Sequence, residues 1–117
     1  MKLNHLNLTV DDVAAAHQFL QTYFGLQDLG CNQNMGFLAD ENGMVLSLTH
    51  MKVGKETEVR YPASFHIGFM QSSEEQVNEI NQRLRDAGFD VVPAGKAHGS
   101  WTFYFQAPGG FTVEVLC

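Results

Sequence analysis

Three polar side chains, His5, His66 and Glu114, interrupt stretches that otherwise have the composition of β-strands. Two neutral imidazoles and one carboxylate are ligands that can hold a divalent metal ion and leave coordination positions open. Taken one at a time, a histidine facing a pocket more often forms hydrogen bonds in the core, and a glutamate on a terminal strand is commonly exposed. Their related positions in the chain favour a shared metal site.

The two histidines open two copies of one sequence pattern, and each is the fourth residue of its stretch, at residues 2–10 and 63–70. A helical stretch follows in both copies, at 12–24 before Gly25 and at 74–87 before Gly88. Each copy then ends with a turn and a final strand, and matching these strands makes Ser47 the counterpart of Glu114. Internal repetition on this scale determines the architecture.

Strand alternation separates apolar from polar residues, since successive side chains point to opposite faces. His5 opposes Leu6 and Leu8, and Glu114 opposes its apolar neighbours. The helices can cover the apolar faces, leaving the polar faces to line a concave pocket. Their apolar positions at helical spacing are Val13, Ala16, Leu20, Phe24, Val77, Ile80, Leu84 and Ala87.

We therefore predict an α+β fold in which two βαβββ modules form a curved mixed sheet around a metal-binding cavity, with helices outside. The modules are residues 1–50 and 63–117 of a single domain, 1–117, and residues 51–62 form an exposed linker. Middle strands are expected at 27–31, 35–40, 91–93 and 100–106. Because a half of about 60 residues is marginal alone, the halves should fold together or with a partner.

Composition excludes some function classes. A net charge of -6 with seven Lys and Arg argues against nucleic acid, because phosphate binding uses clustered basic residues. No apolar run reaches membrane-spanning length, and no signal-like segment opens the chain, so we expect a cytoplasmic protein that does not contact membranes. The two cysteines, Cys31 and Cys117, are expected to be free thiols.

The repeat, the stretches Leu3-Asn4-His5-Leu6 and Phe65-His66-Ile67, and the run at 103–114 with its Pro-Gly-Gly turn resemble the vicinal oxygen chelate superfamily. That superfamily includes glyoxalase I, extradiol dioxygenases, fosfomycin-modifying thiol transferases and bleomycin-binding proteins. The resemblance implies that His5, His66 and Glu114 hold a divalent ion, Fe²⁺, Zn²⁺, Mn²⁺ or Ni²⁺. It also implies a homodimer and a small oxygen-rich substrate chelated by the metal.

Three readings of the function remain open. The first is a metal-dependent lyase or isomerase, dioxygenase or thiol transferase. The second is a metal-free drug- or metabolite-binding protein of the bleomycin-resistance type, and the third is a scaffold without chemistry. Ser47 departs from the glyoxalase I pattern, which has a carboxylate or equivalent ligand there, and a neutral hydroxyl is a poor ligand and a poor base.

Further residues are candidates for contact with a substrate. Tyr104 shares a strand face with Thr102, and its phenol could donate a hydrogen bond to a substrate oxygen, although a half-buried aromatic with a wet hydroxyl fits equally well. His50 is a weaker candidate for acid–base work, and His98 is in an expected loop that could cover the pocket. His17 is expected at the surface. The substrate-binding candidates are Ser47, Phe37, Met70, His98 and Trp101.

Overall fold

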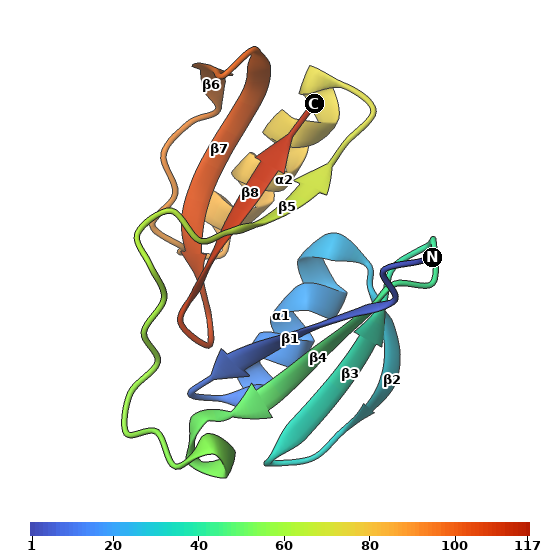
Figure 1. Cartoon of the computed structure of the whole chain (residues 1–117). Helices are drawn as coiled ribbons and strands as arrows, with labels where there is room; N and C mark the ends of the chain where they lie inside the picture. Colours follow the sequence, from blue (N-terminus) through green and yellow to red (C-terminus); the bar gives the residue numbers. More distant parts are fainter. The chain divides into compact units, whose positions relative to one another are not determined.

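A computed structural model describes all 117 residues of the chain (Figure 1). Its elements, in chain order, are β1 (His5–Val10), α1 (Val13–Phe24), β2 (Gln27–Cys31), β3 (Met35–Ala39), β4 (Val45–His50), the 3₁₀ helix η1 (Met51–Gly54), β5 (Ile67–Met70), α2 (Glu74–Asp86), β6 (Gly95–Ala97), β7 (Ser100–Ala107) and β8 (Phe111–Leu116).

The strands form two four-stranded sheets, in the orders β1-β4-β3-β2 and β5-β8-β7-β6. In each sheet the first strand of the module pairs in parallel with the last, β1 with β4 and β5 with β8. The predicted α+β fold with two βαβββ modules is confirmed. By its contacts the chain divides into unit 1, residues 1–62 and 107–111, and unit 2, residues 63–106 and 112–117.

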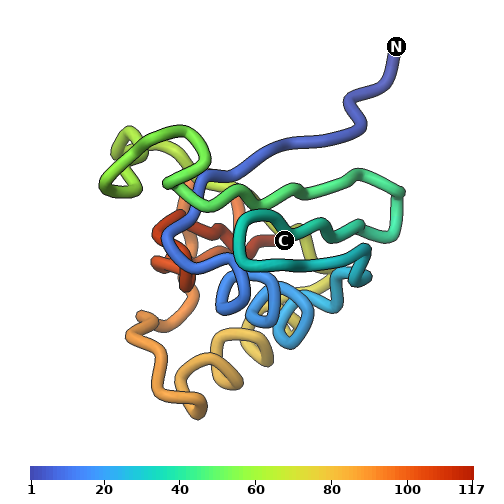
Figure 2. The backbone as a smooth tube through the Cα atoms, turned by 90° about the horizontal axis from the view of Figure 1, so that it is seen from below, coloured from blue at the N-terminus to red at the C-terminus, as the bar shows by residue number.

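Unit 1 has its core between α1 and one face of its sheet. Leu8, Val10 and Leu48 are fully buried, and Val13 and Leu20 of α1 are buried with them. Figure 2 shows α1 running along one side of the strands of its own sheet. Asp12 caps the helix by accepting a hydrogen bond from the Ala15 backbone at 3.0 Å.

Unit 2 repeats this arrangement with α2. The Ser73 side chain caps the helix by accepting from the Gln76 backbone at 3.2 Å, and Gln76 in turn accepts from the Ser72 backbone at 2.9 Å. Val77 and Leu84 are fully buried, as are the apolar residues Val113 and Val115 of β8. The alternation in β8 therefore places Glu114 on the face away from that apolar row.

Two predicted local features were wrong. Residues 91–93 do not form a strand; the short strand is β6, residues 95–97. Pro93 has no backbone N–H to give to a sheet, and the Val92 carbonyl accepts instead from the buried Asn81 side chain at 2.7 Å. Ala87 was predicted to face the core but is exposed, because α2 ends at Asp86 and Ala87 caps it.

Most residues of the linker, 51–62, are exposed, but it contains local structure. It begins with the 3₁₀ helix η1, and the Tyr61 hydroxyl near its end donates to the Thr9 carbonyl at 2.6 Å. The two cysteines are free, as expected. Neither helix is long and apolar enough to cross a membrane.

Candidate functional site

Four side chains of unit 2 form what we call the His66 cluster: His66, Thr102, Tyr104 and Glu114. Glu114 belongs to β8, an inner strand, and is only 9 % exposed. Its Oε1 accepts from the Thr102 hydroxyl at 2.9 Å, and its Oε2 lies 3.3 Å from Nε2 of His66. The buried carboxylate is thus held at one oxygen and faces the imidazole with the other.

Strand register explains why these side chains meet. Gly68 of β5 pairs with Glu114, and His66 lies directly before β5. A Cβ atom at Gly68 would lie 3.8 Å from Oε2 of Glu114, so the glycine keeps the approach to that oxygen open. Two backbone hydrogen bonds join Trp101 to Cys117, which places Tyr104, three residues further along β7, opposite Glu114.

The hydrogen bond of Nδ1 determines which nitrogen of His66 faces Glu114 and which one carries the hydrogen. Nδ1 lies 3.0 Å from the Ser64 carbonyl, which can only accept, so Nδ1 carries a hydrogen. In neutral His66, Nε2 then presents a lone pair to the Glu114 carboxylate at 3.3 Å. Two acceptors facing each other need either a proton or a metal cation between them. An imidazole whose other nitrogen donates to a backbone carbonyl is the usual arrangement of a metal-ligating histidine.

Tyr104 completes the cluster. Its ring meets the His66 imidazole edge-on, with centroids 5.3 Å apart and an interplanar angle of 87°. The hydrogen bond that its hydroxyl donates to Glu114 raises the pKa of the phenol, and burial and the negative charge of Glu114 act in the same direction. The phenol therefore keeps its proton and can serve as a hydrogen-bond donor.

The structure brings together two of the three predicted metal ligands. His5 lies in unit 1, where its Nδ1 contacts Oδ1 of Asn4 at 2.7 Å. Within each unit no three His, Cys, Asp or Glu side chains gather closely enough to share an ion. The donor chemistry of the His66–Glu114 pair nevertheless fits a divalent cation, because imidazole nitrogen and carboxylate oxygen both bind such ions.

Unit 1 carries the matching positions of the repeat. Ser47 pairs with Asn7 of β1, as Glu114 pairs with Gly68, so the register agrees with Ser47 as the counterpart of Glu114. On its other side Ser47 pairs with Phe37 of β3, which is 36 % exposed. The Asn7 side chain accepts from the hydroxyls of Ser47 and Thr49, at 2.9 and 2.6 Å. We call Asn7, Ser47 and Thr49 the Asn7 cluster.

Sequence reasoning did not select Asn7 or assign a role to Thr102, although both have the strand phase of residues that it did select. Asn7 shares the phase of His5, and Thr102 that of Tyr104. The strand register, which shows each of them beside its partner, was the missing information.

Other candidates have local structural roles. Nδ1 of His50 accepts from the Lys52 backbone at 3.1 Å and caps η1. His98 is not in a covering loop: with φ of 53°, it forms a two-residue turn with Gly99 between β6 and β7. The Trp101 indole donates to Asn78 of α2 at 2.9 Å, so it faces away from the His66 cluster. Met70 is 77 % exposed at the end of β5.

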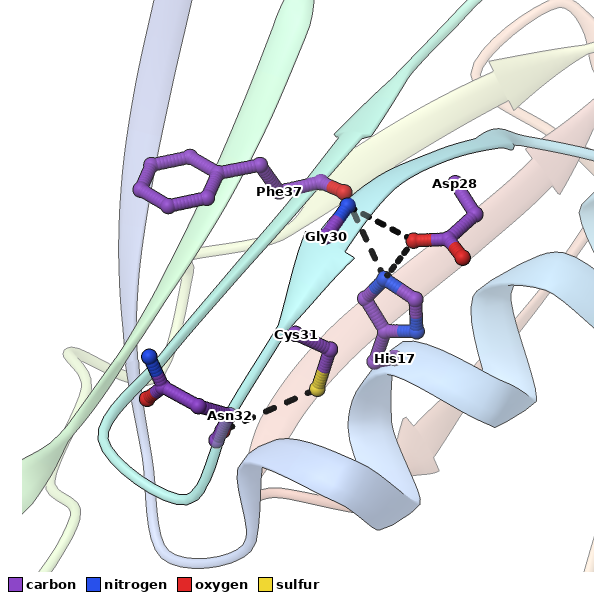
Figure 3. A network of polar contacts seen from close by, with 6 residues as sticks. All are labelled: His17, Asp28, Gly30, Cys31, Asn32 and Phe37. Atoms are coloured by element: carbon purple, nitrogen blue, oxygen red, sulfur yellow. Dashed lines mark hydrogen bonds and ion pairs between the residues drawn. The ribbon is translucent and has the colours of Figure 1, made fainter.

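His17 was predicted at the surface, but it is 5 % exposed beneath β3 (Figure 3). Its Nε2 lies 3.1 Å from Oδ1 of Asp28 and 3.3 Å from the Phe37 carbonyl. The same Asp28 oxygen accepts from the Gly30 backbone at 2.8 Å. Gly36 leaves space for the imidazole ring, because a Cβ at this position would lie only 3.2 Å from Cδ2 of His17. His17 thus ties α1 to two strands.

Cys31 lies in the same network, where its thiol contacts the Asn32 carbonyl at 3.7 Å. Burial raises the pKa of this thiol, and the negative charge of Asp28 adds to the effect. A thiol that holds its proton is a weak nucleophile, so this network stabilises structure rather than providing a reactive group.

Comparison with known proteins agrees with the repeat and its strand order. The glutathione transferase FosA of Serratia marcescens is 27% identical over 113 residues, covering 97% of this chain and 78% of FosA. The structure of a possible glyoxalase from Bacillus cereus is 49% identical, with a TM-score of 0.89 and coverage of 100% of this chain and 99% of that one.

A lactoylglutathione lyase structure from Agrobacterium tumefaciens shares the fold at 22% identity, with a TM-score of 0.77 and coverage of 98% of this chain and 92% of that one. The family model described as Glyoxalase/Bleomycin resistance protein/Dioxygenase superfamily matches residues 2–115. With this match over nearly its whole length, the chain belongs to that superfamily.

Proposed function

We propose that this chain is a metal-dependent enzyme acting on a small oxygen-rich substrate, with His66, Glu114 and His5 as the residues that hold the ion. The observation that carries the proposal is the 3.3 Å approach of Nε2 of His66 to the buried Glu114 carboxylate, with Nδ1 committed to the Ser64 carbonyl. When bound, a divalent ion would act as a Lewis acid that polarises substrate oxygens.

The remaining residues of the cluster support this role. Thr102 and Tyr104 both donate to the Glu114 carboxylate and hold it beside His66. Tyr104 is 37 % exposed and keeps its proton, so its single O–H could turn from Glu114 to a substrate oxygen and stabilise negative charge there. Position 47 is a serine and therefore offers no carboxylate to act as a base. This favours a dioxygenase or thiol transferase over an enzyme that moves a proton between neighbouring carbons.

His5 supplies the third ligand from unit 1, and we propose that the complete site is built in a homodimer. A module of each kind is required, because the His66 cluster alone offers only two ligands. Three protein ligands leave positions open for two substrate oxygens, whereas two ligands hold a divalent ion weakly.

Elemental analysis of protein purified without a histidine tag tests the proposal. We expect about one divalent ion per chain, and loss of the ion in His66→Ala and Glu114→Gln but not in His98→Ala, which removes an imidazole from a turn. Equal metal content in the wild type, His66→Ala and Glu114→Gln would contradict the proposed ligands.

The metal-free alternative has one observation in its favour: a proton on Nε2 of His66 would also satisfy the Glu114 carboxylate. Such a protein would bind a cationic drug or metabolite without an ion. Ligand-induced thermal shift in chelator-treated protein, together with absence of metal from the untreated protein, would support this function instead.

A further inference from the structure

The face of the first sheet that α1 does not cover carries an oriented carboxamide. Asn7 is exposed, and its Oδ1 accepts two hydrogen bonds, from Ser47 at 2.9 Å and from Thr49 at 2.6 Å. Its Nδ2 makes no hydrogen bond to the protein. The two amide hydrogens are therefore available to a ligand.

The hydroxyl hydrogens determine which way the amide points. Thr49 has no other acceptor in the protein, and the alternative acceptor of Ser47, the Leu6 carbonyl, is 3.4 Å away. If the amide were flipped, Nδ2 would face both hydroxyls and the Thr49 hydrogen would have no protein acceptor. The Asn7 cluster thus holds the carboxamide with its donors outward.

The position of Asn7 relates these donors to the proposed site. Asn7 is two residues beyond His5 in β1, so the two side chains lie on the same face, about 7 Å apart along the strand. That distance allows a small molecule near the His5 imidazole to reach the Asn7 amide. The neighbouring Phe37, across Ser47 in register, gives this face an apolar border.

Ser47 has a different task here from that of its counterpart Glu114. Its side chain is 7 % exposed and is directed to Asn7 rather than to a ligand. A hydroxyl that orients a carboxamide adds hydrogen-bond donors to the face without adding charge. An acceptor oxygen of a substrate, above all an anionic one, is the group that two N–H donors recognise.

We propose that Asn7 is a specificity-determining residue that binds a carboxylate or carbonyl oxygen of the substrate through Nδ2, and that Ser47 and Thr49 are its positioning residues. The inference rests on the proposed function, because it takes the substrate to lie beside His5. It goes beyond that function by requiring that the substrate carry a further acceptor oxygen, separate from the oxygens that the ion would bind.

Oxalate, a small dicarboxylate, is a suitable probe. Calorimetric titration of Mn²⁺-loaded protein would compare wild type with Asn7→Asp and Asn7→Leu. Aspartate can still accept from Ser47 and Thr49, but it replaces the donor with an acceptor. We expect oxalate to bind about three- to tenfold more weakly to Asn7→Leu, as for one lost hydrogen bond, and more weakly still to Asn7→Asp. Asn42→Asp, the same change at an exposed turn, should bind oxalate like the wild type.

Two further results separate the inference from the function on which it rests. Unchanged oxalate affinity in Asn7→Asp, with Mn²⁺ still bound, would overturn the role of Asn7 and leave the metal site intact. If the wild type binds no Mn²⁺, the proposed metal function fails. The side-chain amide signals of Asn7 in a ¹⁵N spectrum of metal-free protein then decide: a shift on addition of oxalate supports the donor role, and constant signals refute it.

Discussion

The phenol of Tyr104 reports the charge on Glu114. The Glu114 carboxylate accepts a hydrogen bond from the protonated phenol and so raises the pKa of Tyr104. The protonated phenol therefore stabilises the folded protein at lower pH. This contribution is lost as the pH rises through the folded-state pKa of Tyr104. Replacing Glu114 with Gln removes the charge, and the pKa of Tyr104 should fall toward its ordinary value. Ultraviolet titration of chelator-treated protein measures this, with Tyr104→Phe to identify the signal.

Glu79→Gln, on the exposed side of α2, is the matched control and should leave the titration of Tyr104 unchanged. An unaltered curve in Glu114→Gln would mean that the two side chains do not interact in solution.

The hydrogen bonds of His17 can be tested by substitution. His17→Leu removes the donor to Asp28 and the Phe37 carbonyl, and should lower the free energy of unfolding by about 1 kcal/mol. Glutamine carries an amide N–H near the place of Nε2, so His17→Gln should recover part of the loss. Urea denaturation measures both, and Gln18→Leu, one position along on the exposed side of α1, is the control.

Alternation in sequence predicted which faces of β7 and β8 carry Thr102, Tyr104 and Glu114. It placed Tyr104 and Thr102 on one face and Glu114 apart from Val113 and Val115, as the structure has them. It could not predict the burial of His17, because that depends on Gly36, a residue of a different element that leaves space for the ring.

At the scale of elements, the turn between β7 and β8 is a close contact in unit 1. Gly109 has φ of 104°, its carbonyl accepts from the Asp11 backbone, and a Cβ there would lie 3.0 Å from that of Ala16. Gly109→Ala therefore combines backbone strain with a collision, and should lower the free energy of unfolding by more than about 2 kcal/mol.

Gly43→Ala separates the two causes. Its φ is 78°, but nothing lies within 4 Å of a Cβ at that position, so only backbone strain, about 1 kcal/mol, is expected. Equal losses in chemical denaturation of the two variants would show that the contact with Ala16 is unimportant.

Helix ends and most strands were predictable from local signals, since the helices predicted at 12–24 and 74–87 are Val13–Phe24 and Glu74–Asp86 in the structure. The wrong strand at 91–93 shows the limit of such signals. An apolar pair beside a proline is consistent with a strand, but only the fold reveals that Asn81 binds the Val92 carbonyl.

At the scale of the whole molecule, the proposed trio can be tested by mixing two defective chains. If His5 of one chain completes the site of another, dimers of His5→Ala with His66→Ala contain one site free of both changes. We expect isolated mixed dimers to hold about half of the metal of wild-type dimers, and an equal co-refolded mixture about a quarter, whereas each variant alone binds little. No recovery in verified mixed dimers would place the trio within one chain.

The repeat predicted the number of modules and the βαβββ order of elements along each of them. It could not place His5 relative to His66 and Glu114, because the strand pairing within each module does not determine the arrangement of the modules. The set of three ligands therefore stays a prediction. The structure supports it through the 3.3 Å approach of His66 to Glu114.

The irregular edge of the first sheet has a consequence for solubility. β2 pairs Asp28 with Leu38 and Gly30 with Phe37, which leaves Leu29 as an extra, unpaired residue. Asp28 closes this bulge through the Gly30 backbone, with His17 behind it. A strand bent in this way offers no regular ladder of donors and acceptors to a neighbouring molecule. The network around His17 thus makes the β2 edge a poor template for pairing with another molecule.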